Sequence, residues 1–252
     1  CLWLIAMVYD YALWNDDKPF VAELMPGVRL VLDKLLALRS ADGLVRQPGG
    51  WHFVDWVDRW PYGIAPQDAD GISAVYNWQM VYTLRLAGEL EQYMEEPELA
   101  GKWNNEAAKL ADRCIASFWD AARQRMANTR DLRDSSEHVL AMAILSGMLP
   151  GVMRDGCAEA LHRHEDLDRA SIFYAHYVFE AYAALDRTDW ILDKLTPWYD
   201  LEKHGLKTTP EIFSEESRSD CHAWGAHPLY HMMTAFLGIR PLSLTDRRLL
   251  IQ

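Results

Sequence analysis

The sequence has few cysteines, fewer basic than acidic residues and no long hydrophobic run. Four cysteines occur in 252 residues, at positions 1, 114, 157 and 221, and they form neither a CxxC pair nor another metal-ligand spacing. Nothing in this pattern demands an oxidising compartment. Lys and Arg number 25 against 37 Asp and Glu, which gives a net charge of −12. That balance argues against nucleic acid or an anionic membrane surface as the main partner.

No apolar stretch approaches the roughly 20 residues that a membrane-spanning helix needs. The chain opens with Cys-Leu-Trp-Leu-Ile-Ala-Met-Val-Tyr-Asp, without an initiator Met or a basic segment, so we do not expect this opening to be a signal peptide. This opening reads as the middle of a helix. We therefore expect the sequence to be a fragment that is cut at this end.

The chain is rich in apolar and aromatic residues. Half of its residues are hydrophobic and 12% are aromatic, including 11 Trp. This length and composition are sufficient for one domain with a sizeable core. The abundance of Trp suits a carbohydrate-binding cleft, because indole faces pack well on sugar C–H groups.

Apolar residues recur at helical spacing along most of the chain. The expected helices cover residues 2–13, 19–36, 66–93, 99–118, 136–149, 150–165, 170–185, 190–199 and 226–237. Pro26 is expected in an early turn, Thr188 or Asp189 as a helix cap, and Gly238 as a helix stop. The first convincing strand is residues 249–251. The pattern predicts an all-α fold.

Short turns alternate with two long loops, residues 49–61 and 207–228, that are rich in aromatic and charged residues. The helices show no fixed repeat period, so a closed toroid is favoured over an open array. The (α/α)6 six-hairpin barrel fits, with its active-site loops at one end, but the chain supplies only about four hairpins. We expect residues 1–241 to be a barrel that is incomplete at its N-terminus, and residues 242–252 to begin a truncated C-terminal β-sandwich.

The second long loop holds the residues with the richest chemistry. Glu211, and Glu215 or Glu216, are candidates for a general base, while His222 offers a hydrogen bond and Trp224 a flat face for a sugar. The alternative is a solvated loop followed by ordinary core residues. We expect this loop to converge with the one that contains Asp55.

The string Thr-Thr-Pro-Glu at 208–211, followed by Arg-Ser-Asp-Cys-His-Ala-Trp-Gly-Ala-His-Pro-Leu-Tyr at 218–230, resembles the C-terminal signature of bacterial α-L-rhamnosidases of glycoside hydrolase family 78. Phe-Val-Asp-Trp at 53–56 resembles the Asp-Trp loop of that family. The segments 118–120, 136–138 and 174–177 resemble its helix-terminal landmarks more weakly, and a structural role is favoured for each.

The resemblance implies the C-terminal part of a six-hairpin catalytic domain that hydrolyses terminal α-L-rhamnosides with inversion. It makes Glu211 the general base. Glu215 is the fallback, because Pro210 precedes Glu211 and the gap to the Arg-Ser-Asp element is one residue longer than expected. The general acid of the family lies in an acidic Gly-Trp motif upstream of the first helix. No such motif occurs in these 252 residues. We therefore expect the catalytic activity of this polypeptide to be strongly reduced.

Asp55 is the expected ligand of a sugar hydroxyl, and Trp51, Trp56 and Trp224 offer apolar faces to the deoxysugar. The implied partners are rhamnose-containing glycosides or polysaccharides, with no cofactor, in the cytoplasm or periplasm of a bacterium. The alternatives are another six-hairpin hydrolase, such as an unsaturated uronyl hydrolase, and a non-catalytic helical toroid that binds a glycan or a protein.

Three histidines raise the question of a metal. His227 and His231 are spaced i, i+4, and His222 lies close by in the sequence. No Asp or Glu completes the set within that helix, and Pro228 stands between the pair. The sequence therefore predicts no metal site, and His222 is better placed to bond a sugar hydroxyl or the base.

Overall fold

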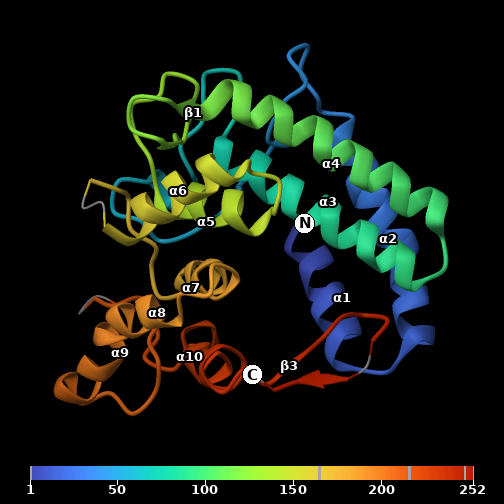
Figure 1. The fold of residues 1–252 in the computed structure, drawn as a ribbon. Helices are drawn as coiled ribbons and strands as arrows, with labels where there is room; N and C mark the ends of the chain where they lie inside the picture. The colour runs from blue at the N-terminus through green and yellow to red at the C-terminus, as the bar shows by residue number, and fades with distance from the viewer. Residues whose placement is uncertain (1, 164–165, 215–216, 247, 252) are drawn as a thin grey trace.

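The computed structural model describes residues 2–163, 166–214, 217–246 and 248–251. The described chain is mostly helical, which confirms the expected all-α class in its broad form (Figure 1). Its elements in chain order are α1 (Leu2–Trp14), α2 (Lys18–Leu36), η1 (Pro61–Gly63), α3 (Ala74–Tyr93), α4 (Pro97–Phe118), β1 (Trp119–Asp120), β2 (Arg125–Met126), α5 (Glu137–Leu145), α6 (Gly151–Arg163), α7 (Ala175–Ala184), α8 (Thr188–Lys194), α9 (Thr196–Asp200), η2 (Glu202–His204), η3 (Ala223–Ala226), α10 (Pro228–His231), the π-helical turn η4 (Met232–Phe236), β3 (Arg240–Pro241) and β4 (Leu249–Leu250).

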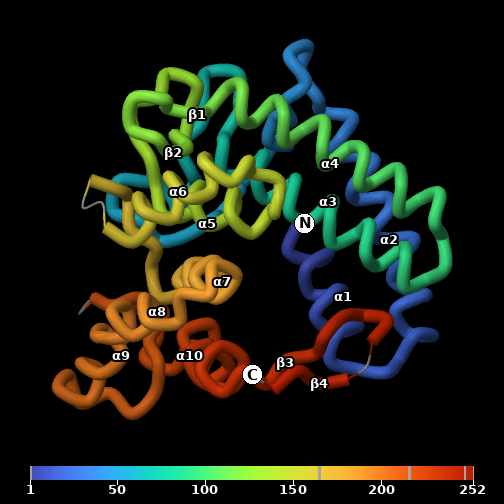
Figure 2. The backbone as a smooth tube through the Cα atoms, viewed as in Figure 1, coloured from blue at the N-terminus to red at the C-terminus, as the bar shows by residue number. Residues whose placement is uncertain are grey.

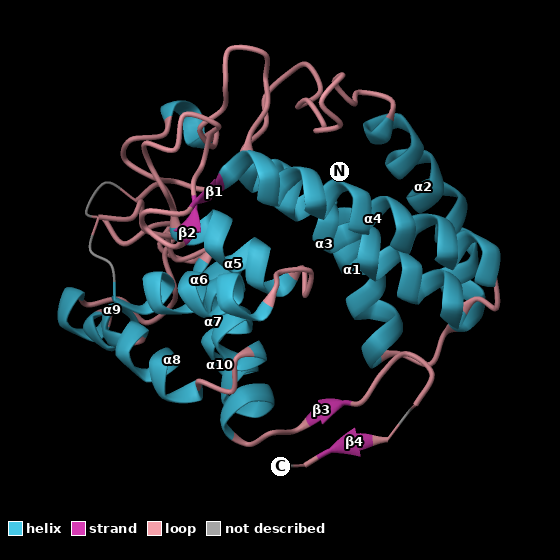
Figure 3. Ribbon diagram, turned by 45° about the horizontal axis from the view of Figure 1, so that its top comes forward, coloured by secondary structure: helices cyan, strands magenta, loops and turns pink. Residues whose placement is uncertain are grey.

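Helix α3 is the centre of the core. It packs against α4, α1 and α5, and almost every side chain along it is buried. Helix α4, in contrast, buries one stripe that includes Trp103, Leu110 and Phe118 and exposes its polar face, as an amphipathic outer helix does. The helices follow an arc from α2 round to α10 (Figure 3).

Helix α1 covers part of this core and leaves part of itself uncovered. Leu2, Ile5 and Val8 are buried, whereas Leu4 and Met7 on its other side are 44% and 66% exposed. The helix is therefore apolar on both its covered and its exposed side, as its sequence predicts.

Several helix boundaries differ from the sequence prediction. Helix α2 runs without interruption through Pro26, which is not in a turn. Helix α3 begins at Ala74, so residues 66–73 are a loop. Helix α8 begins after Arg187 with no side-chain cap, so neither Thr188 nor Asp189 is the cap. The expected long helix at 226–237 is the short α10 followed by the wider turn η4.

Strands β3 and β4 form a small antiparallel hairpin beside the end of α1 (Figures 1 and 2). The hairpin spans the expected domain boundary at 241/242, and Leu244 within it is buried in the main core. Whether a β-sandwich begins here stays a prediction.

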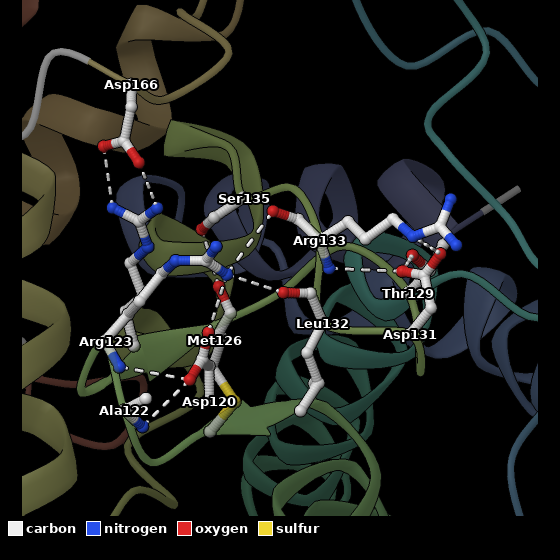
Figure 4. A network of polar contacts seen from close by, with 11 residues as sticks. Asp120, Ala122, Arg123, Met126, Thr129, Asp131, Leu132, Arg133, Ser135 and Asp166 are labelled. Carbon is white, nitrogen blue, oxygen red and sulfur yellow. Dashed lines mark hydrogen bonds and ion pairs between the residues drawn. The ribbon is translucent and has the colours of Figure 1, made fainter.

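A second small strand pair, β1 with β2, follows α4 and is held by side chains (Figure 4). The Asp120 carboxylate accepts hydrogen bonds from the backbone N–H groups of Ala122 and Arg123 at 2.9 and 3.1 Å. The Arg125 guanidinium bonds both oxygens of Asp166. These contacts fix the chain where α4 ends. This agrees with the structural role that is favoured for the segment 118–120.

None of the described helices is long and apolar enough to cross a membrane. Cys114 and Cys157 are buried free thiols, Cys221 is an exposed one, and Cys1 lies outside the described residues.

Candidate functional site

The two long loops meet, as the sequence predicts for the segments around Asp55 and Glu211. The indole Nε1 of Trp56 donates to Glu211 Oε1 at 3.0 Å. The ring of Phe53 is nearly parallel to that of Trp224, with an angle of 3° and centroids 6.2 Å apart. Residues separated by about 155 positions in the chain thus form one contact surface.

The Glu211 carboxylate is held by charge as well as by the indole. The Arg218 guanidinium donates to both of its oxygens, with Nε 3.2 Å from Oε2. Glu211 is only 6% exposed, whereas the Arg218 side chain is 71% exposed. The hydrogen bond from Arg218, and after it that from Trp56, lowers the pKa of Glu211 against the opposing effect of burial. Glu211 is therefore ionised at neutral pH.

Backbone pairing within the second loop sets the position of Glu211. Its N–H donates to Ser219 O at 2.8 Å, and the N–H of His222 donates to Thr209 O at 2.7 Å. The indole Nε1 of Trp224 donates to the Glu211 carbonyl oxygen at 2.8 Å. Because the loop closes on itself in this way, the glutamate, His222 and Trp224 are held as one unit.

Asp55 lies beneath this surface and not in it. It is fully buried, and its carboxylate accepts hydrogen bonds from His138 Nε2 at 2.7 Å and from the Ser171 N–H at 2.7 Å. The Ser171 hydroxyl and the N–H of Trp56 also donate to it. With both oxygens bonded to the protein, Asp55 joins the first long loop to α5 and to the turn before α7.

A cleft of about 780 Å³ adjoins Trp56. Its lining includes Asp58, Arg59, Asp168, Arg169, Ser171, Ile172, Ile212 and Phe213. Asp58 is exposed in this cleft, while Asp168 is bound by Arg59 and by the indole of Trp60. The sequence did not single out Asp58, because one acidic residue in an Asp-Arg-Trp run carries no signal of its own.

A second cavity of about 620 Å³ lies between α9 and the second loop. Ile212 and Phe213 line both spaces. The segment that directly follows Glu211 therefore separates the two spaces.

The other predicted site residues differ in their surroundings. The ring centroids of His222 and Trp224 are 4.0 Å apart. Trp51 is 66% exposed, and its Nε1 donates to the Tyr62 carbonyl oxygen and not to the site. Glu215 lies outside the described residues.

In the described part of the chain, one group of side chains has the composition of a metal site. It consists of His176, His227 and His231, which the sequence did not bring together. His227 Nε2 bonds the carbonyl oxygen of Ile172, a residue that lines the cleft.

No protein-family model matches the chain, and no curated protein matches it. Solved structures do match. A GH78 family rhamnosidase of Bacillus sp. GL1 has a TM-score of 0.84 at 23% identity, over 96% of this chain and 26% of that one. A rhamnosidase from Klebsiella oxytoca with rhamnose bound has a TM-score of 0.79 at 21% identity, over 94% of this chain and 46% of that one.

An α-L-rhamnosidase from Aspergillus terreus has a TM-score of 0.80 at 16% identity, over 98% of this chain and 30% of that one. The chain thus spans between about a quarter and a half of the length of these three proteins. At these identities the likeness is one of fold: the chain has the fold of a helical part of rhamnosidases.

Proposed function

We propose that this chain is part of the catalytic domain of a glycoside hydrolase that cleaves terminal α-L-rhamnosides with inversion, and that Glu211 is its general base. Residues 1–241 would then belong to an (α/α)6 barrel, and residues 242–252 would begin a β-sandwich. The motif resemblance at 208–230 and the fold likeness to three rhamnosidases support this. The observation that carries it is an ionised Glu211 that is bonded by Trp56, a residue that lines an open cleft.

An inverting hydrolase needs a carboxylate that takes a proton from the attacking water and a second group that protonates the leaving oxygen. Glu211 is ionised, as a base must be. Its Oε2 accepts one hydrogen bond, at 3.2 Å from Arg218 Nε, which leaves a lone pair on this oxygen for the attacking water. The chain offers no motif for the second group, and none is assigned.

The aromatic side chains supply the sugar-binding surface. Trp56 and Trp224 both bond Glu211, so apolar faces and the base are held together. Asp55 acts in this proposal as a positioning residue, since its carboxylate fixes the backbone N–H of Trp56 and does not reach the cleft. His222 lies beside Trp224, where it can bond a hydroxyl group.

A second function is favoured by one observation. Both oxygens of the Glu211 carboxylate accept hydrogen bonds, from Arg218 and Trp56, and a structural ion pair has this arrangement as well as a base. A helical toroid that binds a rhamnose-containing glycan without cleaving it would keep this pair intact.

The experiment is hydrolysis of an aryl α-L-rhamnoside whose dinitrophenolate leaves without protonation. Such a substrate needs the base but not the acid, so it tests Glu211 in this 252-residue chain. General-base assistance contributes about 10²–10⁴-fold, so Glu211→Gln should lower turnover by about that factor. The exposed Glu202 is the matched control, and Glu202→Gln should leave turnover unchanged.

Glu215→Gln distinguishes the two possible registers of the base. If it abolishes turnover while Glu211→Gln spares it, Glu215 is the base. Rhamnose binding without any hydrolysis by the wild-type chain supports the glycan-binding toroid instead.

A further inference from the structure

Three histidine rings form a nearly equilateral triangle between α7 and α10. The ring centroids of His176 and His227 are 5.5 Å apart, those of His176 and His231 5.1 Å, and those of His227 and His231 5.2 Å. One nitrogen from each ring lies within 4.8 Å of the other two. His231 is buried and the other two are partly buried.

The contacts of each ring show which of its nitrogens is available to a metal. His227 Nε2 lies 3.0 Å from the Ile172 carbonyl oxygen, which only accepts, so the ring carries its proton there and its Nδ1 has a free lone pair. His231 Nδ1 donates to the His227 carbonyl oxygen at 2.9 Å, so a metal there would displace this proton to Nε2, which lies 3.1 Å from Glu180 Oε1. His176 Nδ1 is buried and has no hydrogen-bond partner among the described residues.

We propose that His176, His227 and His231 bind one zinc-type divalent cation through their Nδ1 atoms, with water as the fourth ligand. Neutral imidazole nitrogens are preferred zinc ligands, and a site with three protein ligands keeps one position open. His227 Nδ1 and His231 Nδ1 are 3.4 Å apart. Two nitrogens on a tetrahedral zinc ion, each about 2.0–2.1 Å from it, are separated by about 3.3–3.4 Å.

The outer contacts match those that metal-binding histidines make. Such a histidine donates its other ring N–H to a carboxylate or a backbone carbonyl, which fixes the tautomer. The Ile172 carbonyl oxygen is such a partner for His227, and the Glu180 carboxylate lies 3.1 Å from His231 Nε2, where it can accept once that nitrogen carries the proton. Both partners come from the α7 side of the site, so they hold His227 and His231 toward His176.

One further contact is consistent with metal binding. His231 Nδ1 also lies 2.9 Å from the His227 carbonyl oxygen. This oxygen keeps the backbone N–H of His231 as a donor, at 3.2 Å, when the ring nitrogen turns to a metal.

The sequence predicts no metal here because it shows only the i, i+4 pair His227 and His231. The fold adds His176 and Glu180, which lie about 50 residues earlier in the chain. A bound ion would clamp α7 to α10. It would thereby fix the end of the second long loop, in which Gly225 packs on Ile172 and Thr209.

The test is zinc binding by the metal-stripped 252-residue chain, with calorimetry for affinity and elemental analysis for stoichiometry. We expect one zinc per chain and a melting temperature that rises with zinc concentration. Glu180→Gln should weaken binding by about 10–100-fold, as loss of an outer partner does. His176→Phe should weaken it by more than that, whereas His204→Gln, at an exposed histidine outside the cluster, should change it less than about twofold.

Cobalt gives a readout that does not depend on a variant folding. Tetrahedral Co²⁺ in the wild-type chain should show strong visible absorption that is lost when zinc displaces the cobalt. Folding of each variant is checked by circular dichroism in metal-free buffer. The proposal is overturned if the wild-type chain binds no stoichiometric zinc at micromolar concentration, or if His204→Gln weakens binding as much as His176→Phe. Neither outcome depends on rhamnoside hydrolysis.

Discussion

The Arg218 guanidinium is the main cause of the lowered pKa of Glu211. A carboxyl group whose pKa is lower in the folded state stabilises the fold above its ordinary pKa of 4.5, and this stability is lost as the pH falls through the lowered pKa. Replacing Arg218 with Gln should therefore raise the pKa of Glu211 toward its ordinary value.

The expected result is an acidic limb of the kcat/KM profile that lies at higher pH in Arg218→Gln than in the wild type. Arg163→Gln is the control, because Arg163 pairs with Glu159 on α6, away from the site. An unchanged acidic limb in Arg218→Gln would show that the titrating base is not Glu211.

Trp56 also contributes to the ionised state of Glu211, through its indole N–H. Trp56→Phe keeps an aromatic face and removes the donor, so the acidic limb should again move to higher pH, by less than in Arg218→Gln. Trp51→Phe is the matched change, because the Trp51 indole bonds Tyr62 and not the carboxylate. Equal shifts in the two variants would count against the role of this hydrogen bond.

The sequence predicted which residues belong to one site where these residues lie together in a short motif. Glu211, His222 and Trp224 lie within 14 positions of one another, so the motif alone groups them. The burial of Asp55 was not predictable, because its partners His138 and Ser171 are 83 and 116 positions away. Arg218 gave no signal of its own, since an exposed Arg in a polar loop is ordinary.

At the scale of elements, Asp55 connects the first long loop to the helices below it. Asp55→Asn turns one acceptor into a donor against His138 and Ser171, so about 1–3 kcal/mol of the free energy of unfolding should be lost. Asp58→Asn, three residues further on at an exposed position, should change it by less than about 0.5 kcal/mol. Urea unfolding measures both, and equal values would contradict the buried role of Asp55.

Gly225 holds the turn η3 against the two segments beside it. A Cβ at this position would lie 2.6 Å from Ile172 Cδ1 and 2.9 Å from Thr209 Cβ, so Gly225→Ala should lower thermal stability and displace Trp224. A Cβ added at Gly101 in α4 would meet no neighbouring atom within 4 Å, so Gly101→Ala should stabilise the chain by about 0.5–1 kcal/mol. Melting temperatures that move in the same direction would refute this packing.

The helices themselves were predictable because apolar residues recur at helical spacing, as in α4. The residues at which the helices begin and end were harder to predict. Ile72 is fully buried although it lies in a loop, so apolar spacing alone extended α3 too far. The Thr234 hydroxyl bonds the Tyr230 carbonyl oxygen where α10 widens into η4, and spacing does not reveal such a change of turn.

At the scale of the whole molecule, the order of helices and loops was enough to predict a helical domain with its long loops converging. It was not enough to find the histidine triangle, because that depends on how α7 and α10 lie side by side. The cleft beside Trp56 and this triangle share Ile172, whose carbonyl oxygen bonds His227 and which lines the cleft. The proposed metal and the proposed catalytic base are thus supported by the same part of the fold.

The most direct measurement of the central claim is the product that Glu211→Ala forms from an activated aryl α-L-rhamnoside in the presence of azide. Azide attacks without losing a proton, so it bypasses a missing general base. If Glu211 activates water in an inverting reaction, azide should restore turnover in proportion to its concentration, and NMR should show a rhamnosyl azide of β configuration. A product of α configuration, or a Glu211→Ala variant that hydrolyses the substrate as fast as the wild type and ignores azide, would contradict the claim.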